Sequence, residues 1–574
     1  MHDFSNVINL EKLINSSLKN NTSFTGNLNS TDKTITSYLD LLYSRILYAC
    51  GENKKYLLKA AILQSDYKEI EFSEKIYDFT AAMLHLEKEQ ISLLYLNQDI
   101  DLDRNSAFKI SNFLLESYKK KLNSLLINTS REHALQYFYM ISSIISHITS
   151  ISHYQFKYKI IPPIEKTKDY INLIIDTIGI IYDENQQILN GLTGSEKKIF
   201  EYLVHYILNE QLDFVEIDHA TLDIEEIILT TANIIHISQY QKSINSFYKL
   251  GYKFEIKDSI LRIEDGLEIK INHFLKRTSE ITIDIDSPES RNIYKMFEKK
   301  RGYSPFLLEQ YIRSESKFLN SNYISNIIEK DALIIDMCFV TGKSRETIIK
   351  LLEDLSLNLA EDFFKEAFGK KNRIFRTPLI QIKNYFLISH MLLIEAAHLF
   401  RIRLLKDSLN TTIDNDTQNE ITKTIDEQEL NNLALLFKEN NVVGQIGFEL
   451  NKYNDCKELF KEKGVKQELD AYFIQDNILY IIELKNREPD RSLKELVGSI
   501  TVNNKHIIKL LKLKHIVMQN KEIMQYVLGG EFSEVHIFLT YTNPNFSEHT
   551  HKFEDNITIC NYKDCFEFCK RKIH

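Results

Sequence analysis

Apolar positions in residues 1–190 recur at three- and four-residue intervals, which is the period of an amphipathic helix. The segments "TSYLDLLYSRILYACGENKKYLLKAAILQ", "YDFTAAMLHLEKEQISLLYL" and "ALQYFYMISSIISHITSISHY" show this period clearly. The helical pattern returns at 301–407. Its most apolar stretch, "YFLISHMLLIEAAHLF" (385–400), is too short to span a bilayer and carries two His and one Glu, so a buried core helix is predicted.

The intervening residues 191–300 are mixed. "YKFEIKDSILRIEDGLEIKIN" alternates with period two and has a turn signal at Lys257-Asp258, which predicts hairpin strands. Further on, "ALIIDMCFVTGKSRET" (332–347) predicts a strand, a Gly-Lys-Ser turn and a helix. A Walker A loop is disfavoured there, because Met337 stands where that motif requires Gly.

The pattern changes after a polar segment rich in Thr, Asn and Asp, which is interpreted as a linker. Beyond it, apolar runs follow the order α-β-β-β-α-β, typical of a compact α/β domain. The chain is therefore predicted to be multi-domain, with a mostly α-helical N-terminal region and a C-terminal α/β domain around a mixed central sheet. The expected parts are a helical domain (1–190), a mixed α/β module (191–300), a helical region (301–407), a linker (408–426) and the α/β domain (427–574).

Composition narrows the class of protein. The chain has 574 residues, of which 43% are hydrophobic and 26% charged, as in ordinary globular proteins. A net charge of −9 argues against a general basic coat for nucleic acid, but a local basic groove stays open. Six cysteines make no disulfide framework, and the N-terminus has no basic segment followed by an apolar run. A cytoplasmic protein that does not enter a membrane is expected.

The candidate catalytic residues lie in two neighbouring segments that are predicted to be strands, "QELDAYFI" and "ILYIIELKN". Asp and Asn tolerate the positive φ of a tight hairpin turn, so Asp476–Asn477 are taken as the two turn residues. Counting outwards, Asp470 then faces Glu483, and Glu468 faces Lys485. Period-two alternation sets all four on one face of the sheet.

Two opposed carboxylates destabilise a sheet, so a purely structural role would not select Asp470 against Glu483. A divalent cation makes the pairing favourable, because Mg²⁺ is held by one or two carboxylates plus substrate phosphate and water. Lys485 would then stabilise an attacking hydroxide or a developing negative charge. The pattern predicts metal-assisted hydrolysis of a phosphodiester.

Asp470 and the run Glu483-Leu484-Lys485, at the end of an apolar strand, resemble the motif of the PD-(D/E)XK nuclease superfamily. The resemblance covers 427–574 and implies a restriction-endonuclease-like fold. It also implies that Asp470 and Glu483 are ligands of Mg²⁺ or Mn²⁺, that the Leu484 carbonyl is a further ligand, and that Lys485 is the catalytic lysine. One departure is Leu469, which precedes Asp470 where the family commonly has Pro.

The family often adds a Glu on the first helix. By this resemblance Glu429 is the choice, and Glu449 on the next strand is its rival. Many members also carry Gln or Lys on the helix after the lysine strand. That helix lacks Gln here, so Asn503, Asn504 or Lys505 would have to serve.

The same helix carries Lys505, Lys509 and Lys512 at i, i+4 and i+7, with Ile508 and Leu511 expected on its other side. This stripe either follows phosphates or is the solvated face of an amphipathic helix, and the sequence does not separate the two. A second basic segment, "KEAFGKKNRIFRTP" (365–378), is interpreted as a solvated loop in preference to a nucleic-acid contact.

The resulting hypothesis is a Mg²⁺-dependent endonuclease. DNA is expected as the substrate in preference to RNA, although the sequence leaves that choice open. The helical region would recognise a protein or small-ligand partner or restrain cleavage. A large helical region before such a domain also resembles Shedu-type anti-phage nucleases, which implies a role in antiviral defence. The alternative is a non-catalytic sensor whose nuclease-like fold is only a binding platform. The oligomeric state stays open, and a homo-oligomer is compatible with either function.

Overall fold

The computed structural model describes residues 28–49, 78–94, 99–154, 192–209, 222–249, 251–263, 271, 288–314, 326–357, 373–405, 429–460, 468–485, 493–542, 545–546 and 556–573. The chain divides into two compact units. Unit 1 comprises Met1–Ile244, Lys253–Ile263 and Phe297–Ile402, and unit 2 comprises Asn245–Tyr252, Glu264–Met296 and Arg403–His574. Unit 1 thus draws on all three regions expected before residue 407, whose boundaries stay predictions. The expected linker lies outside the described residues.

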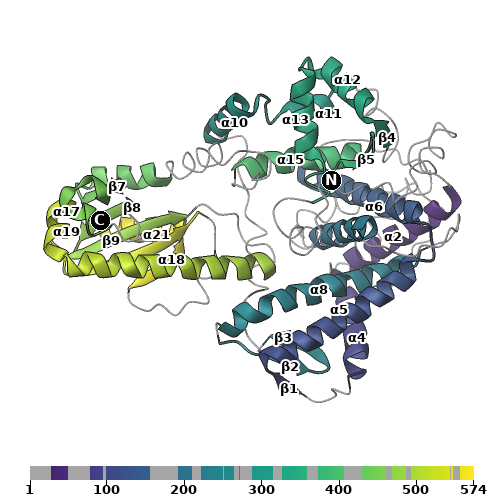
Figure 1. Ribbon diagram of the computed structural model, residues 1–574, viewed down its shortest axis with the longest axis horizontal. Coiled ribbons are helices and arrows are strands. Elements are labelled where there is room, and N and C mark those ends of the chain that lie inside the picture. Colours follow the sequence, from purple (N-terminus) through teal and green to yellow (C-terminus); the bar gives the residue numbers. More distant parts are fainter. Residues whose placement is uncertain are drawn as a thin grey trace. The chain divides into compact units, whose positions relative to one another are not determined.

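Helices predominate up to residue 405 (Figure 1). They are α2 (Leu28–Ala49), α4 (Phe79–Ser92), α5 (Arg104–Leu126), α6 (Arg131–Tyr154), helical residues 192–209, α8 (Ile224–Lys249), α10 (Pro288–Arg301), α11 (Leu307–Ile312), α12 (Lys330–Thr341), α13 (Arg345–Leu355) and α15 (His390–Leu405). The described parts of the helices predicted in 1–190 are confirmed as α2, α4 and α6, and the rest of the first segment, from residue 50, lies outside the described residues. Local capping explains where some begin: Asp103 precedes α5, and its side chain accepts a hydrogen bond from Ser106 N at 2.7 Å.

The predicted hairpin in the middle of the chain is confirmed as β2 (Phe254–Lys257) and β3 (Ile260–Ile263), which pair antiparallel. Its turn lies one residue later than predicted, at Asp258–Ser259, where both residues have positive φ (54° and 57°). A short strand far away in sequence, β1 (Ile100–Leu102), adds to the outer edge of β2.

A second small sheet was not predicted. It has the order β4-β6-β5, with β4 at Asn326–Glu329, β5 at Ile380–Ile382 and β6 at Tyr385–Ile388. The prediction of one helix over 385–400 is therefore wrong in its first four residues. They are aromatic or branched, and pairing on both sides makes them the central strand. The helix begins only after Ser389, whose carbonyl accepts from Leu393 N at 3.0 Å.

The strand predicted before the Gly-Lys-Ser turn is also wrong, because those residues form α12. Gly342 ends this helix in the left-handed conformation (φ 66°). Ser344 then caps α13 by accepting a hydrogen bond from Thr347 N at 3.3 Å. The turn thus serves as a helix–helix connection.

The C-terminal region confirms the α-β-β-β-α-β order. Helical residues 429–439 are followed by β7 (Val443–Glu449), β8 (Glu468–Gln475), β9 (Ile478–Lys485), α18 (Leu493–Gln519), β10 (Glu534–Tyr541), β11 (Ile557–Asn561) and α21 (Tyr562–Ile573). Three short helices were not predicted: η3 (Leu450–Lys452), α17 (Asn454–Lys457) and α19 (Lys521–Leu528).

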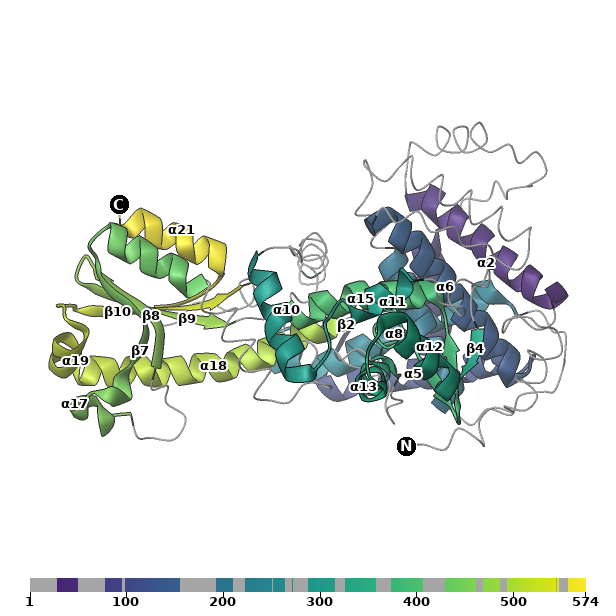
Figure 2. The ribbon, with the colours of Figure 1, turned by 90° about the horizontal axis from the view of Figure 1, so that it is seen from above.

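The five strands form one mixed sheet in the order β11-β10-β9-β8-β7, in which β9, β10 and β11 are parallel and β7 and β8 antiparallel to their neighbours. Helices cover both faces (Figure 2). Leu510, Leu513 and Val517 of α18 pack on one face, and the helix at 429–439 packs with α21 on the other. The chain is thus mostly helical, with a five-stranded mixed sheet in its C-terminal region.

Candidate functional site

The candidate site begins with the β8–β9 hairpin, whose predicted turn is confirmed. Asp476 (φ 52°) and Asn477 (φ 61°) are both left-handed, as a two-residue type I′ turn requires. The predicted register is confirmed as well, with Gln475 opposite Ile478 and each further pair in step as far as Ala471 and Ile482.

Asp470 lies one step beyond the last of these pairs. Its carboxylate Oδ2 accepts a hydrogen bond from the backbone N–H of Leu484 at 2.8 Å. In a strand, the N–H and C=O of one residue point to the same side. The Leu484 carbonyl is therefore directed to the side of the strand on which Asp470 lies. The hairpin brings one carboxylate and one main-chain carbonyl together here.

Glu483 and Lys485 flank Leu484 on β9. Lys485 Nζ lies 2.6 Å from Glu483 Oε1, and the two side chains are only 27% and 7% exposed. Their parallel partners on β10 are Leu539 for Glu483 and Tyr541 for Lys485. Because Leu539 and Tyr541 belong to the core beneath α18, alternation sets Glu483 and Lys485 on that same face.

This ion pair occupies the carboxyl end of two parallel strands. Such an end is where ligands bind in many open α/β sheets. A buried ion pair seldom stabilises a protein more than well-packed apolar residues of similar volume would. A contribution to stability is therefore a poor explanation for an ion pair at the end of an apolar strand.

The predicted pairing of Glu468 with Lys485 is wrong. The cross-strand partner of Glu468 is Glu449 on β7, while Lys485 binds Glu483. The physical reason lies in Asp470, whose side chain takes the Leu484 N–H that would otherwise bond to the β8 backbone. The described β8–β9 pairing consequently ends at Ala471.

The two candidates for an additional acidic ligand lie elsewhere, Glu449 at the end of β7 and Glu429 on a helix. Glu449 is bound to Lys452 at 3.0 Å. Glu429 begins the helix at 429–439, which packs on the face opposite α18, and its carbonyl accepts the Tyr562 hydroxyl at 2.7 Å. Among the described side chains, no group of three or more His, Cys, Asp or Glu residues is arranged to hold a metal ion.

The remaining donor set still suits a hard cation. Asp470, Glu483 and the Leu484 carbonyl offer two carboxylates and one carbonyl. Mg²⁺ is usually held by one or two carboxylates, and substrate phosphate and water complete its octahedral shell. The residues present therefore fit Mg²⁺ or Mn²⁺ bound together with a substrate.

Of the three residues proposed to replace the family's Gln or Lys on α18, only Asn503 is buried. Its Nδ2 donates to Asn545 Oδ1 at 2.7 Å, and its Oδ1 accepts the Tyr541 hydroxyl. Asn504 and Lys505 are exposed. Sequence reasoning missed Tyr541 and Asn545. The alternation of apolar residues along 535–541 was the available signal for Tyr541, since it sets that residue on the α18 face.

The lysine stripe of α18 is exposed as predicted for Lys505, Lys509 and Lys512. The expectation that Ile508 and Leu511 form the buried side is wrong, because Ile508 is 58% exposed and Leu511 36%. The buried positions are instead Leu510, Leu513 and Val517. The exposed face of α18 therefore carries Ile508 and Leu511 as well as the lysines.

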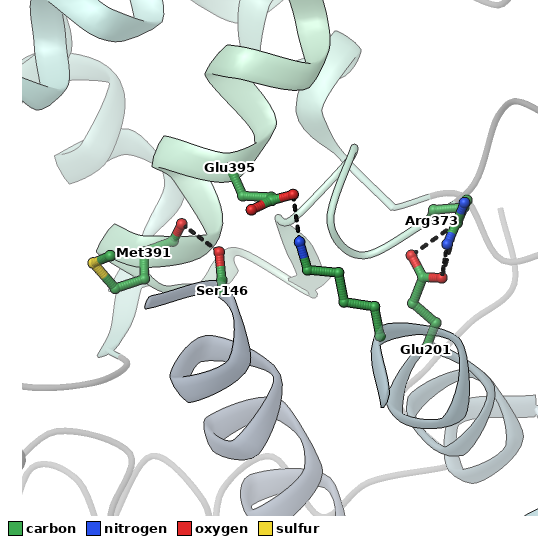
Figure 3. Close-up of polar contacts among 6 residues, drawn as sticks. Ser146, Glu201, Arg373, Met391 and Glu395 are labelled. Atoms are coloured by element: carbon green, nitrogen blue, oxygen red, sulfur yellow. Dashed lines mark hydrogen bonds and ion pairs between the residues drawn. The ribbon is translucent and has the colours of Figure 1, made fainter. Parts of the chain in front are cut away.

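The described end of the basic segment at 365–378 is neither a solvated loop nor a free basic patch. Arg373 is bound to Glu201, with Nη2 2.7 Å from Oε2, and the Glu201 side chain is buried. A second buried carboxylate of unit 1, Glu395, binds Lys197 at 2.6 Å (Figure 3). Arg373 therefore neutralises a buried carboxylate of unit 1.

Among the helices described, none combines the length and the apolar character that a bilayer span requires. Comparison with known proteins finds no matching family model, curated protein or solved structure. What the C-terminal sheet does is therefore inferred from its own residues.

Proposed function

We propose that the protein is a metal-dependent nuclease that hydrolyses phosphodiester bonds at the carboxyl ends of β9 and β10. The observation that carries this proposal is the arrangement around Leu484: the Asp470 carboxylate bonded to its N–H, and on either side of it the buried Glu483 paired with the half-buried Lys485. The mixed sheet with helices on both faces agrees with the restriction-endonuclease-like fold that the motif implies.

Each residue has a distinct role in this proposal. Asp470, Glu483 and the Leu484 carbonyl would hold Mg²⁺ or Mn²⁺, which when bound polarises a phosphoryl oxygen and lowers the pKa of a coordinated water. Lys485 lies beside Glu483, so its ammonium can stabilise negative charge on the phosphate during attack. Burial of the pair strengthens that interaction, because water screens it less.

DNA is the proposed substrate, and cleavage assays with both nucleic acids decide between DNA and RNA. The exposed stripe of Lys505, Lys509 and Lys512 offers positive charge on the helix that covers the same face of the sheet. It is the proposed phosphate-tracking surface. Recognition of a partner or restraint of cleavage by unit 1, and a role in antiviral defence, are carried over from the resemblance as proposals.

The test is cleavage of supercoiled DNA, linear DNA and RNA by the full chain with Mg²⁺ or Mn²⁺. The variants are Lys485→Ala, Asp470→Asn and, as a matched control, Lys570→Ala, which removes an exposed lysine from α21. Loss of one stabilising group in an active site costs about 10²–10³ in rate, so the first two variants should lose at least that much. Lys570→Ala should cleave normally.

Cleavage that persists in Lys485→Ala would refute the site. An absence of cleavage on every substrate and with either metal would favour the alternative, a binding platform without catalysis.

A further inference from the structure

Three buried polar side chains meet at the end of β10. Tyr541 and Asn503 are fully buried, and Asn545 is 3% exposed. The Tyr541 hydroxyl donates to Asn503 Oδ1, and Asn503 Nδ2 donates to Asn545 Oδ1 at 2.7 Å. We call these three residues the Tyr541 network. It joins the last residue of β10, the middle of α18 and the segment that follows β10.

The Tyr541 network lies directly beside Lys485. Tyr541 is the parallel register partner of Lys485, and both side chains lie on the α18 face. The next residue, Thr542, donates its backbone N–H to the Lys485 carbonyl at 3.1 Å. Hydrogen bonds therefore link Asn545 through Asn503 to Tyr541, and the covalent backbone of β10 joins Tyr541 to Thr542, which bonds to the main chain of Lys485.

We infer that Asn503, Tyr541 and Asn545 are positioning residues for the Glu483–Lys485 pair, an inference that rests on the proposed function. The lysine stem is flexible, and a displacement of about 1 Å at a reacting group can cost about 10²-fold in rate. A satisfied, buried polar network is rigid, because each member would be left unpaired if it moved. The network thus holds the end of β9 in one place against α18.

The structure offers a matched pair of variants. Tyr541→Phe removes the hydroxyl of the network. Tyr472→Phe removes another buried hydroxyl beneath the same face of the sheet, where Tyr472 donates to the Leu528 carbonyl at 3.1 Å. Each variant removes a buried hydroxyl that donates a hydrogen bond, so a general loss of stability should affect both alike.

The first readout is steady-state cleavage of DNA by the full chain. Tyr541→Phe should lower kcat by about tenfold and leave KM within about twofold, because positioning acts in the transition state and not on binding. Tyr472→Phe should keep both parameters within about twofold of the natural protein.

The second readout needs no activity. Trace acetylation of the intact protein, followed by mass spectrometry, measures how readily Lys485 is modified, with exposed Lys570 as internal reference. Tyr541→Phe should raise the Lys485 labelling rate several-fold, and Tyr472→Phe should leave it unchanged. Should Tyr541→Phe not fold, Asn545→Ala opens the same network and should raise the labelling rate as well.

The outcomes separate the two claims. A natural protein that cleaves nothing sinks the proposed function, and the labelling rates then judge the network alone. Equal effects of Tyr541→Phe and Tyr472→Phe on kcat and on labelling overturn the inference. So does an unchanged Lys485 labelling rate in a folded Tyr541→Phe or Asn545→Ala variant.

Discussion

The Glu483–Lys485 pair can be used to separate stability from catalysis. Lys485→Met leaves the Glu483 carboxylate, whose side chain is 7% exposed, without its ammonium. Removing one partner of a buried ion pair costs about 3–5 kcal/mol. Because the Lys485 side chain is 27% exposed and partly solvated, we expect the lower end, about 3 kcal/mol.

The double variant Glu483→Leu/Lys485→Met should recover most of that loss. It removes both charges, and position 483 lies beside Leu539 in an apolar core. Apolar replacement of a complete buried pair is often neutral or stabilising, so the double variant should be within about 1 kcal/mol of the natural protein. Both variants should have lost cleavage.

Calorimetry and urea unfolding followed by circular dichroism measure the difference, since the chain has no Trp for fluorescence. At about 2–4 °C for each kcal/mol in a unit of this size, Lys485→Met should melt roughly 6–12 °C lower. A double variant less stable than Lys485→Met, or a single variant as stable as the natural protein, would show that the pair is not a buried one. A double variant that still cleaves would contradict its catalytic role.

Four further outcomes are expected. Mn²⁺ at 100 times its dissociation constant should stabilise the folded protein by about 2.7 kcal/mol and EDTA should reverse this, whereas the melting temperature of Asp470→Asn should respond to neither. Asn477→Val should be about 1–2 kcal/mol less stable than Asn477→Gly in urea unfolding, because only the β-branched residue resists the φ of 61°. Replacement of Lys505, Lys509 and Lys512 by Gln should reduce the slope of log Kd for DNA against log salt by about 3 if the stripe follows phosphates, and leave it unchanged if it does not. Burial lowers the pKa of His236 to about 4, whereas in the unfolded chain this histidine keeps its ordinary pKa of 6.5. Between these two pH values the unfolded chain therefore binds more protons than the folded protein. Stability should fall as the pH drops from 6.5 to 4, and His236→Phe should flatten that fall in unfolding measured across the range.

The hairpin was predictable because its information is local. Asp476 and Asn477 accept positive φ, and the two-residue turn then sets every pair from Gln475 and Ile478 to Ala471 and Ile482. The same reasoning placed Asp470 beside the end of β9. It failed at Glu468, because a side chain, Asp470, replaced a backbone partner, and the alternating pattern carries no sign of that exchange.

Errors elsewhere arose where an apolar run has no period of its own. "YFLI" at 385–388 reads as helix beside the apolar residues that follow, yet it is the centre of a sheet formed with strands at 326–329 and 380–382. Likewise, α18 has apolar residues on more than one face, so its sequence does not show which face is buried. The sheet selected Leu510 and Leu513 and left Ile508 and Leu511 exposed.

The sequence alone determined the order of the C-terminal elements, the hairpin turn and the run Glu483-Leu484-Lys485 at the end of an apolar strand. Each depends on residues within a few positions of one another, through turn conformation and side-chain alternation. The tertiary structure decided which partners those residues have. Asn503, Tyr541 and Asn545 are separated by up to 42 positions and meet only because α18 packs across the end of β10. Burial of both ends of Asn503 against these partners requires the whole sheet and its helix to be in place.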